Sequence, residues 1–171
     1  MDHVQLEFED INREPKKFPI CILSNGIKLA KNIGSVFRVG EAFGVEKIII
    51  EGLNEKLPNK KFSRVARSTE QFIEYEQSDD LVNNIHRLKA QGYTVVGLEI
   101  TSSSRLISDV DFLNLEKIAL IIGAEVEGID KRILDEVDFC VHIPMYGVNL
   151  SMNVTHALGI ALYEITRQKN S

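Results

Sequence analysis

The sequence lacks the features that mark several large protein classes. Its two cysteines, Cys21 and Cys140, stand alone in apolar runs without a CxxC partner, so it is not a disulfide scaffold and we expect both thiols to be buried and reduced. Its apolar runs, such as residues 118–122, fall far short of the ~20 residues that cross a bilayer. It also lacks a basic excess, with a net charge of −5, which argues at first against a nucleic-acid binder.

What remains is typical of one soluble globular domain. The chain has 171 residues, of which 44% are hydrophobic and 26% charged. A chain of this size buries roughly 70% of its unfolded surface, which is enough for a core that needs no disulfide or metal. Residues 1–17 contain scattered acids and no continuous apolar run, so we expect no signal or transit peptide and a cytoplasmic location. We therefore expect a short N-terminal lead, 1–17, and a single domain, 18–171.

From residue 18 onward, short runs rich in Val and Ile alternate with helical patterns, which is typical of parallel βαβ units. We predict strands at residues 20–23, 45–51, 72–76, 94–100, 118–122 and 139–143. We predict helices at residues 33–43, 79–91, 131–137 and 153–168. The fold class that follows is α/β, with a mostly parallel sheet flanked by helices.

Two of the predicted helices carry further signals. Helix 79–91 has Ser78 as a candidate N-cap and Gly92 where a C′ glycine belongs. The last helix, 153–168, has an apolar stripe that Ile160 and Tyr163 widen beyond one face. In a small domain such a helix is either fully buried or shared with a second subunit, and we expect a homodimer.

Three segments near predicted strand ends combine glycines with polar residues, at the edge where open α/β sheets bind ligands. The first contains Asn32, Gly34 and Arg38 and enters a helix, although an arginine there is often only a solvated charge. The third contains Ser151 and Asn153 and opens the last helix. Either of these two residues is also a plausible helix N-cap without further function.

The second segment runs from Gly123 to Gly128, directly after the strand 118–122. Its two glycines let backbone amides approach a ligand, as dinucleotide-binding loops do. However, the GxGxxG order is absent, no lysine follows, and Glu125 and Glu127 would repel a pyrophosphate. The segment therefore favours a ligand with hydroxyl groups or positive charge over a nucleotide of the Rossmann or P-loop kind.

Taken together, the three segments resemble the motifs of SpoU-type RNA ribose methyltransferases, within the SPOUT superfamily. The resemblance rests on NxGxxxR at residues 32–38, on GxExxG at residues 123–128, and on IPM followed by SxNV at residues 143–145 and 151–154. All three motifs occur in family order with family-like separations. The resemblance extends over nearly all of residues 18–168.

This resemblance implies a SPOUT-type fold with a C-terminal trefoil knot, a homodimer, and S-adenosylmethionine as cofactor. It implies transfer of a methyl group to a ribose 2′-hydroxyl of structured RNA. No metal is implied, and the four histidines of the chain form no metal-ligand cluster. In the family the cofactor is held largely by main chain around three strand ends, and the corresponding positions here are Leu98, Gly123, Gly128, Ile143 and Met152.

The resemblance also implies a reaction centre made of Arg38, Asn32, Glu125, Ser151 and Asn153. Family precedent places the arginine at the reacting hydroxyl, in some members as the base. Because a guanidinium keeps its proton up to a pKa above about 12, we expect Arg38 to anchor an adjacent phosphate or stabilise the developing alkoxide. The proton would then pass to that phosphate or to water.

The family resemblance implies supporting roles for the other four residues of this reaction centre. Asn32 would orient Arg38 or the ribose, and Ser151 and Asn153 would complete the polar rim. Glu125 would hold the cofactor loop and reach Asn32 or Arg38.

The charge of the chain is unevenly distributed. Residues 28–67 hold nine basic and four acidic residues, whereas residues 68–171 hold eight basic and sixteen acidic residues. We expect the basic segment to bind RNA through Lys28, Lys31, Lys60, Lys61, Arg64 and Arg67, with modest and salt-sensitive affinity. The alternative is a solvated charged face.

The RNA substrate is less well defined by the sequence. Residues 59–77 and the motif spacing look closest to the branch that modifies a tRNA guanosine ribose, so we favour tRNA over ribosomal RNA. The alternatives are a ribosomal RNA 2′-O-methyltransferase and a non-catalytic RNA-binding module of the same fold. The presence of all the motif polar residues disfavours the second alternative.

Overall fold

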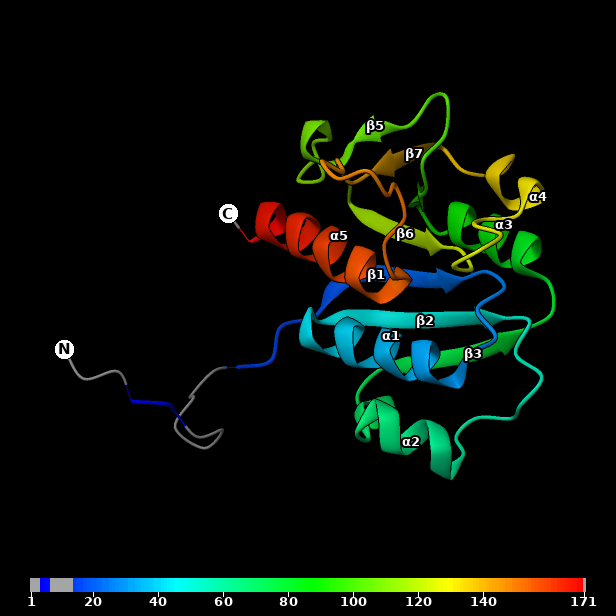
Figure 1. Cartoon of the computed structure of the whole chain (residues 1–171), viewed down its shortest axis with the longest axis vertical. Coiled ribbons are helices and arrows are strands. Elements are labelled where there is room, and N and C mark those ends of the chain that lie inside the picture. Colours follow the sequence, from blue (N-terminus) through cyan, green and yellow to red (C-terminus); the bar gives the residue numbers. More distant parts are fainter. Residues whose placement is uncertain (1–3, 7–13, 171) are drawn as a thin grey trace.

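The apolar runs of the chain pair into one parallel sheet (Figure 1). The computed structural model describes residues 4–6 and 14–170, so most of the expected lead 1–17 lies outside the described residues. The strand order is β3-β2-β1-β6-β4-β7-β5, and each pairing is parallel, which confirms the predicted α/β class. The strands are β1 (Phe18–Ser24), β2 (Val45–Glu51), β3 (Glu74–Ser78), β4 (Tyr93–Leu98), β5 (Arg105–Leu106), β6 (Lys117–Ile122) and β7 (Phe139–His142).

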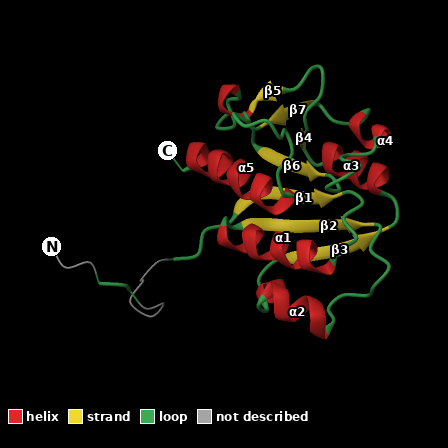
Figure 2. Ribbon diagram, viewed as in Figure 1, coloured by secondary structure: helices red, strands yellow, loops and turns green. Residues whose placement is uncertain are grey.

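Helices cover both faces of this sheet (Figure 2). One face is covered by α1 (Ala30–Ala42), α2 (Lys60–Ala66) and α5 (Val154–Lys169), and the other by α3 (Leu81–Ala90) and α4 (Lys131–Leu134). Successive strand residues point to opposite faces, so Ile22 and Leu23 of β1 belong to two separate core clusters. Burial on both faces explains why these strands read as continuous apolar runs.

The helices α1 and α2 pack closely because Gly34 of α1 has no side chain. A Cβ atom at Gly34 would lie 2.8 Å from Cγ1 of Val65 in α2. The buried ring of Phe37, also on α1, packs edge to face against two other rings. Its centroid lies 4.9 Å from that of Phe62 and 5.2 Å from that of Tyr75. The first motif and the basic helix α2 are therefore parts of one packed unit.

Helix α2 was not predicted from the sequence, and the predicted bounds of β3 were wrong. The helix α2 buries only Phe62 and Ala66, so its apolar period is too short to stand out, and it is capped by Asn59, whose Oδ1 accepts the Phe62 amide at 3.0 Å. Strand β3 begins at Glu74 instead of residue 72, because a 3₁₀ turn, Thr69–Gln71, precedes it. The two-residue strand β5 was not predicted, because it is too short for hydrophobic periodicity to define it. The predicted helix 131–137 is confirmed in part, since α4 begins at Lys131 but ends at Leu134.

One predicted helix signal was wrong and one was confirmed. Asp80, not Ser78, caps α3, since Asp80 Oδ1 accepts the Asn83 amide at 3.0 Å. The Ser78 hydroxyl instead accepts the Asp80 amide at 3.2 Å. Gly92 follows the helix end with a φ of +84°, a left-handed conformation that favours glycine.

Both cysteines are buried, as expected. Burial raises the pKa of the Cys21 thiol to about 12 and also raises the pKa of Cys140, so both stay protonated and unreactive near neutral pH. Among the described residues, no helix is both long and apolar enough to span a bilayer.

Candidate functional site

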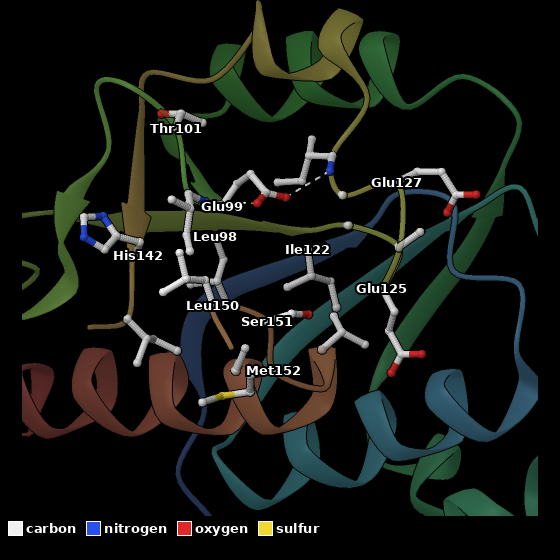
Figure 3. A pocket seen from close by; sticks show the side chains of 18 of the residues that line it. Leu98, Glu99, Thr101, Ile122, Glu125, Glu127, His142, Leu150, Ser151 and Met152 are labelled. Atoms are coloured by element: carbon white, nitrogen blue, oxygen red, sulfur yellow. Dashed lines mark hydrogen bonds between the residues drawn. The ribbon is translucent and has the colours of Figure 1, made fainter. Parts of the chain in front are cut away.

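A cavity of about 460 Å³ lies at the carboxyl ends of β4, β6 and β7 (Figure 3). Its floor is formed where these strands stop, and its remaining walls come from the loop after β6 and from the segment that links β7 to α5. This is the edge at which parallel sheets bind ligands, since the strand ends leave main-chain groups available there.

All five positions predicted to bind cofactor line this one cavity. They come from three strand ends and from the linking segment, and they are Leu98, Gly123, Gly128, Ile143 and Met152. Two members of the predicted reaction centre, Glu125 and Ser151, also line it, whereas Asn32, Arg38 and Asn153 do not. Positions up to 54 residues apart in the chain thus line one cavity, and their roles stay predictions.

The loop after β6 turns back on itself and needs glycine at both ends. The Ala124 amide donates to the Gly128 carbonyl at 3.1 Å, and the Gly128 amide donates to the Ala124 carbonyl at 3.0 Å. A Cβ atom at Gly123 would lie 2.3 Å from the carbonyl carbon of Gly128, which is backbone and cannot move aside. Gly128 has a φ of +69°, which favours glycine. The two glycines spaced five apart therefore define the shape of this wall.

The charged groups of the cavity are carboxylates. Glu99, Glu125 and Glu127 line it, and neither lysine nor arginine is among its described lining residues (Figure 3). His142 also lines the cavity and forms a polar pair with Ser104, in which the histidine Nδ1 lies 3.0 Å from the hydroxyl oxygen. Such a cavity is suited to a ligand with positive charge or hydroxyl groups and poorly suited to a phosphate.

Several lining residues were not predicted from the sequence, including Glu99, Thr101 and His142. The signal that could have found them is their position immediately after β4 or at the end of β7. Strand β4 ends at Leu98, before the predicted end at residue 100, so the residues that follow belong to the cavity wall.

Asn153 links the second and third motifs. It caps α5, since its Oδ1 accepts the Thr155 amide at 2.9 Å, and its Nδ2 donates to Glu125 Oε1 at 2.5 Å. The predicted N-cap role of Asn153 is thus confirmed, and the bond of Asn153 to Glu125 is a contact that the sequence did not indicate. Ser151 is exposed and its amide donates to Asn149 Oδ1. The expected contact of Glu125 with Asn32 or Arg38 was wrong, because among the described residues the Glu125 carboxylate bonds to Asn153.

Asn32 and Arg38 lie on α1, which packs beside α5 (Figure 1). Asn32 is buried in the first turn. Arg38 is exposed, and within the described chain its guanidinium makes no hydrogen bond or ion pair. A free guanidinium on the helix next to the cavity-bearing segment is available to an outside anion.

The residues of the predicted RNA surface are all exposed. Lys28 and Lys31 lie before and at the start of α1, and the others lie on or just after α2, namely Lys60, Lys61, Arg64 and Arg67. In the part of the chain that the structure describes, none of these six side chains has a carboxylate partner. By contrast, Lys47 is paired with Glu74 and Glu76 at 2.9 and 2.8 Å.

The last helix leaves part of its apolar surface uncovered. Ile160 and Tyr163 are 41% and 59% exposed, so the alternative of a fully buried helix was wrong. These residues and Val39 of α1 line a shallow apolar hollow.

The described residues contain no group of three or more His, Cys, Asp or Glu side chains that could hold a metal ion, and His3 lies outside them.

Comparison with known proteins assigns the chain to a family. The model of the SpoU rRNA Methylase family matches residues 19–163. The chain belongs to this family. This SpoU-family chain is 30% identical over 170 residues to the tRNA (guanosine(18)-2'-O)-methyltransferase TARBP1 of Mus musculus. That match covers 97% of the chain but only 11% of the mouse protein, so the chain spans a small part of that relative's length.

Solved structures agree with this assignment. The A. aeolicus TrmH/SpoU tRNA modifying enzyme has 25% sequence identity and a TM-score of 0.81, with 92% of the SpoU-family chain and 78% of that enzyme covered. The AdoMet-bound rRNA methyltransferase of Sinorhizobium meliloti has 22% identity and a TM-score of 0.80, with 91% and 58% covered. At that identity the second similarity shows the fold alone.

The closure of the Gly123 loop predicts a difference between two glycine substitutions. Gly123→Ala forces Cβ into the Gly128 backbone and should lower the free energy of unfolding by about 2 kcal/mol. The matched control is Gly147→Ala in the neighbouring segment, where a Cβ meets nothing within 4 Å and stability should change by less than about 0.5 kcal/mol. Urea unfolding of both variants measures the difference, and equal stabilities would contradict the described closure.

Proposed function

We propose that this chain transfers a methyl group from S-adenosylmethionine to a ribose 2′-hydroxyl of structured RNA. The observation that carries the proposal is the convergence of Leu98, Gly123, Gly128, Ile143 and Met152 on one cavity free of described cationic side chains. Membership of the SpoU family supports the same reaction. The AdoMet bound to the Sinorhizobium relative supports the cofactor.

The chemistry of the cavity fits this cofactor. S-adenosylmethionine carries a sulfonium, an amino group and ribose hydroxyls, and when bound it supplies an electrophilic methyl group. The carboxylates of Glu125 and Glu127 attract positive charge, and the apolar side chains of Leu98 and Ile143 suit an adenine ring. The glycines at both ends of the Gly123–Gly128 loop let a ligand approach the main chain closely, so this wall can recognise a nucleoside without any phosphate.

Arg38 is the residue best suited to hold the RNA at the reacting group. Its planar guanidinium binds a phosphate through two parallel hydrogen bonds, and it has no described partner that would compete. Held in this way, the neighbouring ribose hydroxyl would be aligned for in-line attack, and its proton would pass to the phosphate or to water. Asn32, buried six residues earlier on α1, would orient the arginine or the ribose.

The basic segment is the proposed RNA surface. Because α2 packs tightly on α1 through Gly34, the helix that carries these cations is fixed against the helix that carries Arg38. Their lack of carboxylate partners among the described residues favours a role in binding phosphate over a structural one. The acidic excess falls in residues 68–171, outside the basic segment, so the net charge of −5 does not by itself oppose RNA binding.

A homodimer is the proposed assembly, and the apolar hollow along α5 supports it. Ile160 and Tyr163 present apolar surface that a second copy would cover, next to Val39 on α1. A C-terminal trefoil knot is part of the same proposal and rests on family resemblance.

The favoured substrate is tRNA, because the mouse relative and the A. aeolicus structure are both described as acting on tRNA. Mapping 2′-O-methyl groups in total RNA from cells with and without the gene tests this choice. We expect a site in tRNA to disappear on deletion and to return when the gene is restored. Loss of a ribosomal RNA site instead would favour the alternative substrate, and an unchanged map would contradict the proposed reaction.

Arg38 should be essential to transfer but not to cofactor binding. Arg38→Ala should reduce the single-turnover methylation rate by about 100-fold or more, while S-adenosylmethionine affinity changes by less than about two-fold. Arg38→Lys keeps the charge but loses the planar fork, so it should recover only a small part of the rate. Full activity of Arg38→Ala would exclude the proposed centre, and near-normal turnover of Arg38→Lys would exclude bidentate anchoring.

A further inference from the structure

The loop after β6 is held from both sides by side chains of the neighbouring strands. In the sheet, β6 lies between β1 and β4. Glu99, directly after β4, accepts the Ile129 amide through Oε2 at 3.1 Å. Asn25, directly after β1, accepts the Asp130 amide through Oδ1 at 2.8 Å. Two consecutive amides at the end of the loop are thus bonded to opposite neighbours.

The contacts of the Glu99 carboxylate place it to hold the loop after β6 in shape. Its second oxygen, Oε1, accepts the Ile100 amide at 3.0 Å, so the carboxylate is fixed at both oxygens. Its Oε2 lies where a Cβ on Gly128 would come within 2.7 Å, so the glycine makes room for the carboxylate. Figure 3 shows Glu99 in the cavity wall with its carboxylate directed at the loop.

The opposite anchor is itself held rigidly. Asn25 is buried, and its Nδ2 donates to Glu51 Oε2 at 2.6 Å. Glu51 is 5% exposed, and its Oε1 accepts a hydrogen bond from Arg132 at 2.7 Å, which balances the buried charge. This network fixes the Asn25 amide group, so that its oxygen can only face the loop. The loop therefore has a firm support at β1 and depends on Glu99 for its support at β4.

We propose that Glu99 is a positioning residue for cofactor binding, which rests on the proposed function. By bonding the Ile129 amide it holds the segment 123–128 in the shape that takes S-adenosylmethionine, with Asn25 as the opposite support. A glutamine at this position has only one acceptor oxygen, so its NH₂ group must face either the Ile100 or the Ile129 amide, donor against donor. Glu99→Gln should therefore loosen the loop without removing any atom from the cavity wall.

The experiment measures cofactor affinity by calorimetry for the wild-type chain and two variants. Glu99→Gln should raise the dissociation constant of S-adenosylmethionine about ten-fold. The matched control is Asp138→Asn, because Asp138 also accepts a strand amide, that of Val95 at 2.7 Å, but near the other end of β4 and away from the cavity. Its dissociation constant should change by less than about two-fold.

Steady-state kinetics distinguish a positioning role of Glu99 from a catalytic one. At saturating cofactor, kcat and the KM for RNA of Glu99→Gln should stay within about two-fold of wild type, while the KM for cofactor rises with the dissociation constant. Hydrogen exchange at the Ile129 amide should accelerate in Glu99→Gln and not in Asp138→Asn.

The outcomes are distinguishable. A lower melting temperature of Glu99→Gln with unchanged cofactor affinity would overturn the inference, as would an equal loss of affinity in Asp138→Asn. If Glu99→Gln does not fold, Glu99→Asp keeps the charge but is one methylene shorter, and wild-type affinity in that variant would equally overturn it. No binding of S-adenosylmethionine by the wild-type chain would instead refute the proposed function.

Discussion

The candidate site depends on one close contact between two parts of a single loop. Gly123 lies so near the Gly128 carbonyl that no side chain fits between them, and this contact closes the loop after the central strand β6. The closed loop lines the cavity, and its Glu125 accepts a hydrogen bond from Asn153 at the start of α5. Strand ends, loop and last helix thus form one wall of the cavity.

The two charged surfaces of the chain have different chemical uses. The cavity is lined by carboxylates without described cations, whereas the exposed cations of α2 and the segment before α1 have no described carboxylate partners. Close packing of α1 on α2 at Gly34 keeps the basic helix α2 against the helix that carries Arg38. A cationic nucleoside and a polyanionic RNA can therefore be bound by one small acidic chain without competing for the same side chains.

The sequence predicted the larger elements well because their apolar periods are long. The continuous runs of β1, β2 and β6 and the apolar stripe of α5 carry enough residues to define them. Short elements such as α2 depend on a cap at Asn59 and one tertiary contact, which no period reveals. The motifs located the cavity, but the Glu99 and Asn25 bonds to the loop join residues 30 and 105 positions apart and could not be read from spacing. The knot stays a prediction from the family resemblance.

The most direct test of this account is a crystal structure of the chain with S-adenosylhomocysteine, the cofactor without its methyl group. We predict that the ligand occupies the cavity at the ends of β4, β6 and β7, with main-chain contacts from the loop 123–128 and the segment 143–152. The Glu99 and Asn25 hydrogen bonds to that loop should remain in place. A ligand bound elsewhere, or no binding at millimolar concentration, would contradict the account.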